Sequence, residues 1–228
     1  MRGSPAGCAP GGEAARNCPL LLLSSVVAGK STPRRKAVNM SGSTVQTQSA
    51  DQSTEQGTAL QPELSAERSD LLESLAKQRY FLRYTVRDLT DEQAGIRNTA
   101  SELCLGGLIK HVTATEEQWS NFAVRGTVAM EPGDGWSYDD WANQFAMTPA
   151  DTLAGLLKRY EQVAAHTDEL ITTLDLDAVY PLPPAPWFEP GATWSVRRVI
   201  LHVIAETAQH AGHADILREA LDGQKSMG

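Results

Sequence analysis

Apolar residues recur at helical spacing in four long segments of this chain, and this pattern constrains its fold more than any other feature. Spacings of three, four and seven residues indicate amphipathic helices. We expect these helices over residues 64–89, 105–125, 148–174 and 195–222, and no segment alternates convincingly as a strand does. Four long helices that each bury one face predict an all-α protein with the architecture of a four-helix bundle.

Capping residues predict where the helices begin and end. Thr90 and Gln93 match a capping box, which starts a short turn of helix. Thr148 precedes Pro149, and proline is favoured at the first helical position, so the third long helix is predicted to start here. Ser195 predicts the start of the last helix, and the helix is expected to end just before Gly223.

The connections between the later helices carry further signals. Residues 137–141 have the pattern of a short capped helix. Residues 175–192 contain five prolines, which exclude a regular helix and leave a long connection of a kind that is often functional. Trp187 and Trp194 stand near the end of this connection, where we expect them to line the mouth of a pocket.

The beginning of the chain differs in composition from the remainder. Its Ser-, Thr- and Gln-rich part carries almost no large apolar side chain, so it cannot offset the entropy of ordering. A polar leader follows Met40, which we expect to be the true start of the protein. The expected organisation is a disordered extension over residues 1–61, one helical domain over 62–222 and a short tail over 223–228.

Charge and cysteine content exclude several classes of protein. Residues 1–39 hold six Lys and Arg against one acid, whereas residues 40–228 hold 14 against 27. An acidic body disfavours nucleic acid and anionic membrane surfaces as partners.

No apolar run in the sequence approaches the roughly 18 residues that a membrane-spanning helix needs. The domain holds a single cysteine, Cys104, which we expect to be a core residue, so a reducing cytoplasmic location fits.

Polar residues on the last predicted helix suggest a metal site. His202, Glu206, His210 and His213 are spaced four, four and three residues apart, so they lie along one face. Two ligands separated by four residues can bind one metal ion, and a third ligand must then come from another helix. The best candidate is His111, which lies in an apolar stretch beside two glycines that would allow a close helix approach.

Other interpretations of these residues remain open. A single histidine on an apolar helix face is commonly a core residue, and the polar face of the last helix could be solvated. His202 and His213 could orient the ligands, transfer protons, bind substrate or make structural hydrogen bonds. Burial of Glu206 without a cation or a hydrogen-bond partner would cost several kcal/mol, which favours the metal.

Over about residues 64–222 the chain resembles the DinB-like four-helix-bundle superfamily. It is most similar to the branch that includes mycothiol-dependent maleylpyruvate isomerase and the mycothiol S-transferases. The motifs are Arg87–Gln93, the glycine-containing stretch Leu105–Val112, Glu117–Trp119 and the long run Trp194–Glu219. The resemblance implies that His111, Glu206 and His210 bind a divalent metal. Zinc fits two imidazoles and a carboxylate, and nickel, iron and manganese are alternatives.

The resemblance also implies an activity. In this branch the metal holds the sulfur of a small thiol cofactor such as mycothiol as the thiolate, which attacks a small electrophile. We therefore expect a metal-dependent thiol S-transferase. The alternatives are a non-catalytic module that binds a metal or small ligand, and a metal-dependent hydrolase. A homodimer is also possible, because bundles of this kind often associate through a pair of helices.

Overall fold

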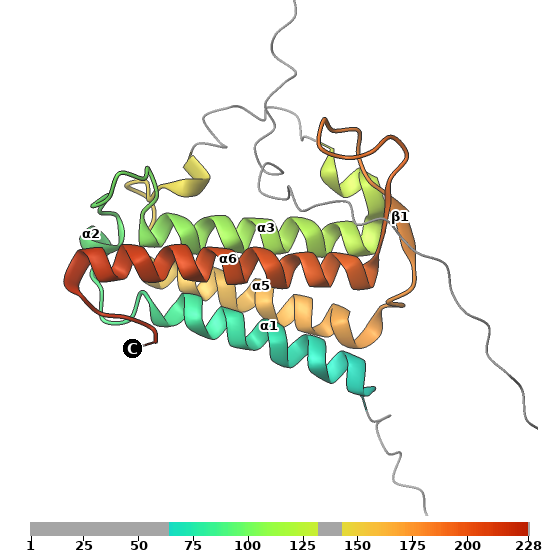
Figure 1. Cartoon of the computed structure of the whole chain (residues 1–228), viewed down its shortest axis with the longest axis horizontal. Helices are drawn as coiled ribbons and strands as arrows, with labels where there is room; N and C mark the ends of the chain where they lie inside the picture. Colours follow the sequence, from blue (N-terminus) through green and yellow to red (C-terminus); the bar gives the residue numbers. More distant parts are fainter. Residues whose placement is uncertain (1–63, 132–142, 228) are drawn as a thin grey trace, which may run out of the picture.

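The computed structural model describes residues 64–131 and 143–227, and these form a four-helix bundle, as predicted (Figure 1). The expected extension over residues 1–61 and the expected short helix at 137–141 lie outside the described residues. Around the bundle, α1 packs against α6, α6 against α3, α3 against α5, and α5 against α1. The long helices are α1 (Ala66–Tyr84), α3 (Leu105–Arg125), α5 (Leu153–Thr173) and α6 (Val196–Asp222).

Short elements connect the long helices. Among the described residues, a one-turn helix follows α1, two 3-10 helices lie between α3 and α5, and a two-stranded antiparallel sheet leads into α6. These elements are α2 (Asp91–Ala94), η2 (Gly126–Met130), η3 (Asn143–Phe145), β1 (Val179–Pro181) and β2 (Thr193–Ser195). The prediction that the chain contains no strand was wrong. Each strand is only three residues long, which is too short for an alternating pattern to stand out.

The apolar core is divided into two clusters with a polar layer between them. One cluster surrounds Leu82, Leu108 and Leu217, and the other surrounds Leu75 and Phe122. Along each long helix, the buried residues between the two clusters include polar ones. This layer contains Arg79 of α1, His111, Thr115 and Glu116 of α3, Thr167 of α5, and Glu206, Thr207 and His210 of α6.

An ion pair on the α1 and α5 side of α3 supplies part of this layer. The Arg79 guanidinium donates to both carboxylate oxygens of Glu116 and, through Nη1, to Oδ1 of Asp168 at 2.7 Å. Arg79 and Glu116 are buried, and Asp168 reaches solvent. Burial alone would lower the pKa of Arg79, but the two carboxylates outweigh it and raise that pKa.

Capping side chains fix most helix ends as predicted. Ser195 Oγ accepts from the Arg198 backbone N–H at 3.1 Å, and Thr90 and Gln93 form the expected capping box. Gly223 ends α6 with φ of 78°, the left-handed conformation that glycine adopts readily.

The predicted start of the third long helix was wrong. Helix α5 begins at Leu153, and Thr152 caps it by accepting from the Gly155 N–H at 3.1 Å. Thr148 instead donates its backbone N–H and its hydroxyl to Asp151, each at 2.8 Å. Because this carboxylate closes a separate turn, the chain enters the helix only after it. The first helix is also shorter than predicted, since α1 ends at Tyr84.

Within residues 64–131 and 143–227, the helices lack the combination of length and apolar character that crossing a membrane requires.

The buried ion pair should make a large contribution to stability. We expect Glu116→Ala to lower the free energy of unfolding by about 3 kcal/mol, because Arg79 would lose its main counter-charge inside the bundle. Glu161→Ala is the matched control, since it removes an exposed partner of Arg83 and should cost less than about 1 kcal/mol. Urea unfolding followed by circular dichroism measures both. Equal effects would contradict the assigned role of Glu116.

Candidate metal centre

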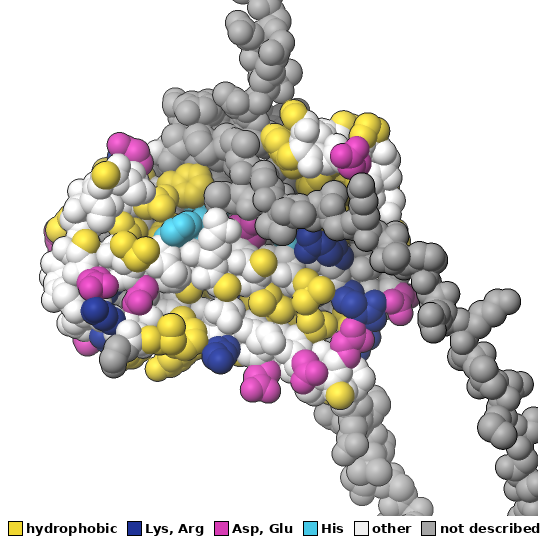
Figure 2. All heavy atoms as spheres, in the orientation of Figure 1, with side chains coloured by type: hydrophobic (Ala, Val, Ile, Leu, Met, Phe, Trp, Pro, Cys, Tyr) yellow, Lys and Arg dark blue, Asp and Glu magenta, His cyan; other side chains and the backbone are white. Residues whose placement is uncertain are grey.

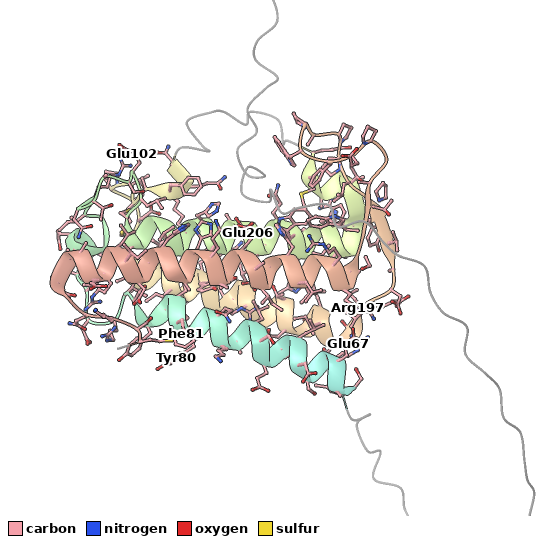
Figure 3. The ribbon with its side chains drawn as sticks, in the orientation of Figure 1. Glu67, Tyr80, Phe81, Glu102, Arg197 and Glu206 are labelled. Atoms are coloured by element: carbon pink, nitrogen blue, oxygen red, sulfur yellow. The ribbon has the colours of Figure 1, made fainter. Side chains whose placement is uncertain are left out.

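Helices α3 and α6 bring three potential metal ligands together inside the bundle. One ligand atom each from His111, Glu206 and His210 lies within 4.8 Å of the other two. The three residues are 3%, 9% and 2% exposed. Figure 3 shows Glu206 on the side of α6 that faces α3. The structure therefore gathers the residues that the sequence resemblance selected.

The two glycines beside His111 permit the close approach of the short 3-10 helix η3 and of the residues that follow it. A Cβ atom added to Gly107 would lie 2.0 Å from the carbonyl oxygen of Phe145, and one added to Gly106 would lie 2.2 Å from the Met147 sulfur. The η3 segment can therefore lie directly on α3. This contact stacks the Phe145 ring on His111, with 4.1 Å between the ring centroids.

Burial keeps the imidazole of His111 neutral. Desolvation, assisted by His210, lowers the pKa of His111 to about 4. A neutral imidazole retains a lone pair, which is the form that binds a metal ion. Thr115 lies one turn further along α3, with its hydroxyl oxygen 3.5 Å from His111 Nε2.

Two ring nitrogens of the cluster are buried without a hydrogen-bond partner among the described residues. They are Nδ1 of His111 and Nε2 of His210. The His210 nitrogen lies 3.7 Å from Oε2 of Glu206, which is too long for a hydrogen bond. Buried polar atoms are rarely left unpaired in proteins, because desolvation without a partner is costly. A divalent cation among these atoms would satisfy them, so the donor set fits a metal ion.

Glu206 supplies the negative charge of the cluster. Burial raises the pKa of this carboxyl, but the neighbouring His210 and His202 outweigh that effect, and the pKa lies below its usual value. Glu206 is therefore ionised at neutral pH. An ionised carboxylate beside the neutral imidazole of His111 favours a cation at this position.

The two neighbouring histidines on α6 lie outside this group of three. His202 Nε2 is 3.9 Å from Oε1 of Glu206, and its ring contacts the rings of Trp119 and Trp194 at 4.7 and 5.1 Å between centroids. Burial lowers the pKa of His202 to about 4. His213 Nδ1 lies 3.4 Å from His210 Nδ1, so the two rings can share a proton. The orienting and proton-transfer roles stay predictions.

Sequence analysis missed several neighbours of the site. Thr115 could have been found, because it follows His111 by four residues on the same helix. Phe145 could not have been found, since no local sequence pattern places a 3-10 helix over α3.

Trp194 was expected at the mouth of a pocket, and its ring stacks on the Trp119 ring with 4.9 Å between centroids. The prediction that Cys104 is a core residue is confirmed, because it is buried and its sulfur caps α3.

The fold and this site define a class of protein: a four-helix bundle whose two facing helices hold a buried pair of histidines and a glutamate. A model of the mycothiol S-transferase family matches residues 70–223, and the chain belongs to this family. The resemblance found in the sequence is thereby confirmed. The membership supports a mycothiol S-transferase-like function at the level of the family.

Comparison with solved structures shows the same fold elsewhere. A conserved protein from Enterococcus faecalis superposes with a TM-score of 0.52 at 13% sequence identity, and the match covers 68% of this chain and 97% of the other. At this identity the likeness establishes the fold alone. No curated protein matches the chain.

Removal of either candidate imidazole ligand should abolish metal binding. We expect the purified full chain to carry about one divalent ion, and His111→Ala and His210→Ala to carry less than about a tenth as much, because two remaining ligands bind weakly. Elemental mass spectrometry after purification without chelator measures this. His166→Ala is the matched control, since His166 is exposed on α5. Equal metal content in all four proteins would refute the site.

The buried neutral histidines should make the metal-free protein sensitive to mild acid. The pKa values of His111 and His202 are about 4 in the folded chain, and histidine in an unfolded chain titrates near 6.5. The unfolded state therefore binds more protons between these values, so stability falls as the pH drops from about 6.5 to 4, by up to about 3 kcal/mol for each histidine.

Urea unfolding in the presence of a chelator across this pH range tests the expectation. His202→Phe keeps a ring against Trp119 and Trp194 and removes one titrating group, so the pH dependence should fall by about half. His166→Ala should leave it unchanged. An unaltered slope in His202→Phe would show that this histidine is not held neutral by burial.

Proposed function

We propose that this protein is a divalent-metal-dependent S-transferase that joins a low-molecular-weight thiol of the mycothiol type to small electrophiles. The observation that carries the proposal is the buried cluster of His111, Glu206 and His210, in which two imidazole nitrogens have no partner among the described residues. Membership of the mycothiol S-transferase family supports the choice of thiol.

The three side chains would hold the metal in distinct ways. His111 is neutral and reaches the cluster from α3, while Glu206 and His210 come from successive turns of α6. A set of three protein ligands, rather than four, is typical of catalytic metal sites. When bound, a divalent cation would supply the positive charge that lowers the pKa of a thiol sulfur.

The donor chemistry favours zinc. Two imidazole nitrogens and one carboxylate oxygen suit zinc, and they are also compatible with nickel, iron or manganese. Glu206 contributes the single negative charge of the set, so part of the charge of a divalent cation would be left to act on an added thiol.

The described residues offer no thiol of their own for the reaction. Cys104 is buried, and its sulfur accepts from the Gly107 N–H at 3.4 Å at the start of α3. A side chain used for capping in the core cannot reach a substrate. The burial of Cys104 supports a cofactor as the source of the nucleophilic sulfur, and we propose that the protein works in a reducing, cytoplasmic setting.

His213 and His202 support the ligands from either side. The contact of His213 with Nδ1 of His210 would fix the orientation of that ring, and His202 Nε2 lies 3.9 Å from Oε1 of Glu206. Such partners of metal ligands determine how the ligands are aimed. His213, which is only half-buried, also offers a position that can accept the proton released by the thiol.

In the proposed reaction the thiol sulfur forms a bond to an electrophilic carbon. The thiol proton passes to solvent or a base, and a leaving group departs with its electron pair. We expect turnover of mycothiol with a chromogenic aryl halide, loss of at least about 90% of the rate on chelation, and recovery on addition of zinc. Release of the chromogenic product measures the rate.

Two variants separate this reaction from alternatives. His210→Ala should be inactive even with added zinc, whereas Cys104→Ser should retain the activity, since a serine hydroxyl can make the same capping bond. Metal-dependent binding of mycothiol without turnover would instead support a non-catalytic binding module. Activity that resists the chelator would contradict the proposal.

A further inference from the structure

A stripe of apolar and small residues runs along the face of α6 that the bundle leaves uncovered. Leu201 is 45% exposed and Ile216 is 64% exposed, although both are large aliphatic side chains. Between them the same face carries Ala205, Ala208 and Gly212, which follow at helical spacing. In Figure 2, hydrophobic side chains form a row along the middle of this face. We call these five residues the α6 stripe.

No neighbouring segment in the described part of the chain requires a glycine at position 212. A Cβ atom added at Gly212 would meet nothing within 4 Å among the described residues, and its φ is not positive. By contrast, Gly106 and Gly107 each admit a neighbouring segment. A glycine inside a long helix destabilises that helix relative to alanine. The lack of a side chain at Gly212 favours the close approach of a group that does not belong to residues 64–131 or 143–227 of the same copy.

Four of the five residues of the α6 stripe are arranged symmetrically about the middle of the helix, and the fifth, Ala208, lies next to the midpoint. Leu201 and Ile216 lie at equal distances from the midpoint between residues 208 and 209, and Ala205 and Gly212 do so as well. If a second α6 ran antiparallel across this midpoint, Leu201 would face Ile216 and Ala205 would face Gly212. In a two-fold interface residue i of one copy contacts residue j of the other and the reverse, and here that rule would place the large residues at the two ends and the small residues near the centre.

Two charged residues on α6 are placed symmetrically about the same midpoint. Arg198 is exposed near the start of α6, and its guanidinium lies over the Trp194 ring with no carboxylate partner in the described part of the chain. Glu219 is exposed near the end of the helix and lies on the same face as the stripe. The antiparallel arrangement brings each Arg198 close to Glu219 of the other copy, so opposite charges meet at both ends.

We propose that the α6 stripe is the contact surface of a homodimer in which two copies pair antiparallel through α6. The candidate metal ligands Glu206 and His210 lie on a different face of the helix, so pairing leaves the cluster accessible. Pairing would also support the helix that carries two of the three candidate ligands. This proposal does not depend on the proposed activity.

Analytical ultracentrifugation of the full chain tests the dimer. We expect the wild type to sediment at twice the chain mass of 24.7 kDa, and Ala205→Glu to sediment as a monomer, with its dissociation constant raised at least about a hundredfold. Ala165→Glu is the matched control, because it places the same charge at an exposed alanine in the middle of α5. Circular dichroism establishes that each variant is folded, and metal content should be unchanged.

Charge reversal and crosslinking test the antiparallel register. Arg198→Glu should weaken the dimer, and the double variant with Glu219→Arg should restore it, since both pairs are then reversed together. Ala208→Cys should form a disulfide-linked dimer under oxidation in a Cys8→Ser, Cys18→Ser background, and Ala165→Cys should not. A monomeric wild type, a dimer that Ala205→Glu leaves intact, or failure of both register tests would overturn the proposal.

Discussion

The polar layer across the middle of the bundle is the constraint on which the rest of the structure depends. Charged and polar groups that are withdrawn from water must find partners, and a bundle interior offers them only on facing helices. Helix α3 lies between two sets of such partners. Glu116 on one face binds Arg79, and His111 on another approaches Glu206 and His210. The rotation of α3 is therefore fixed by polar chemistry as well as by the apolar clusters at either end.

The same layer sets the chemical state of the candidate site. Burial that would be costly for a charged histidine holds His111 in the neutral form, and nearby imidazoles keep Glu206 ionised despite its burial. Residues that are far apart in the chain surround the buried histidines. Phe145 covers His111 only because Gly107 lets η3 lie against α3. Trp194 contacts His202 edge to face because the β hairpin places it at the start of α6.

Sequence predictions succeeded where the deciding interactions are local. Helix α3 has the predicted bounds, and Ser195 and Gly223 bound α6 as expected, because caps act over three or four residues. The start of α5 was misplaced because Asp151 binds Thr148 and competes with the helix, and it also accepts from Lys110 of α3 at 2.8 Å. The hairpin was missed because its pairing of Tyr180 with Trp194 spans a proline-rich loop that carries no strand pattern.

The sequence alone determined the helical periodicity, the four-helix class and the family resemblance. It also determined the spacing that puts Glu206 and His210 on one face of a helix. Each of these features depends on residues within a few turns of one another. The tertiary structure decided the remainder. It brought His111 of α3 to that pair on α6, separated His202 from the group of three, and paired Glu116 with Arg79. These contacts depend on how helices pack, and the order of residues along a single helix does not specify that packing.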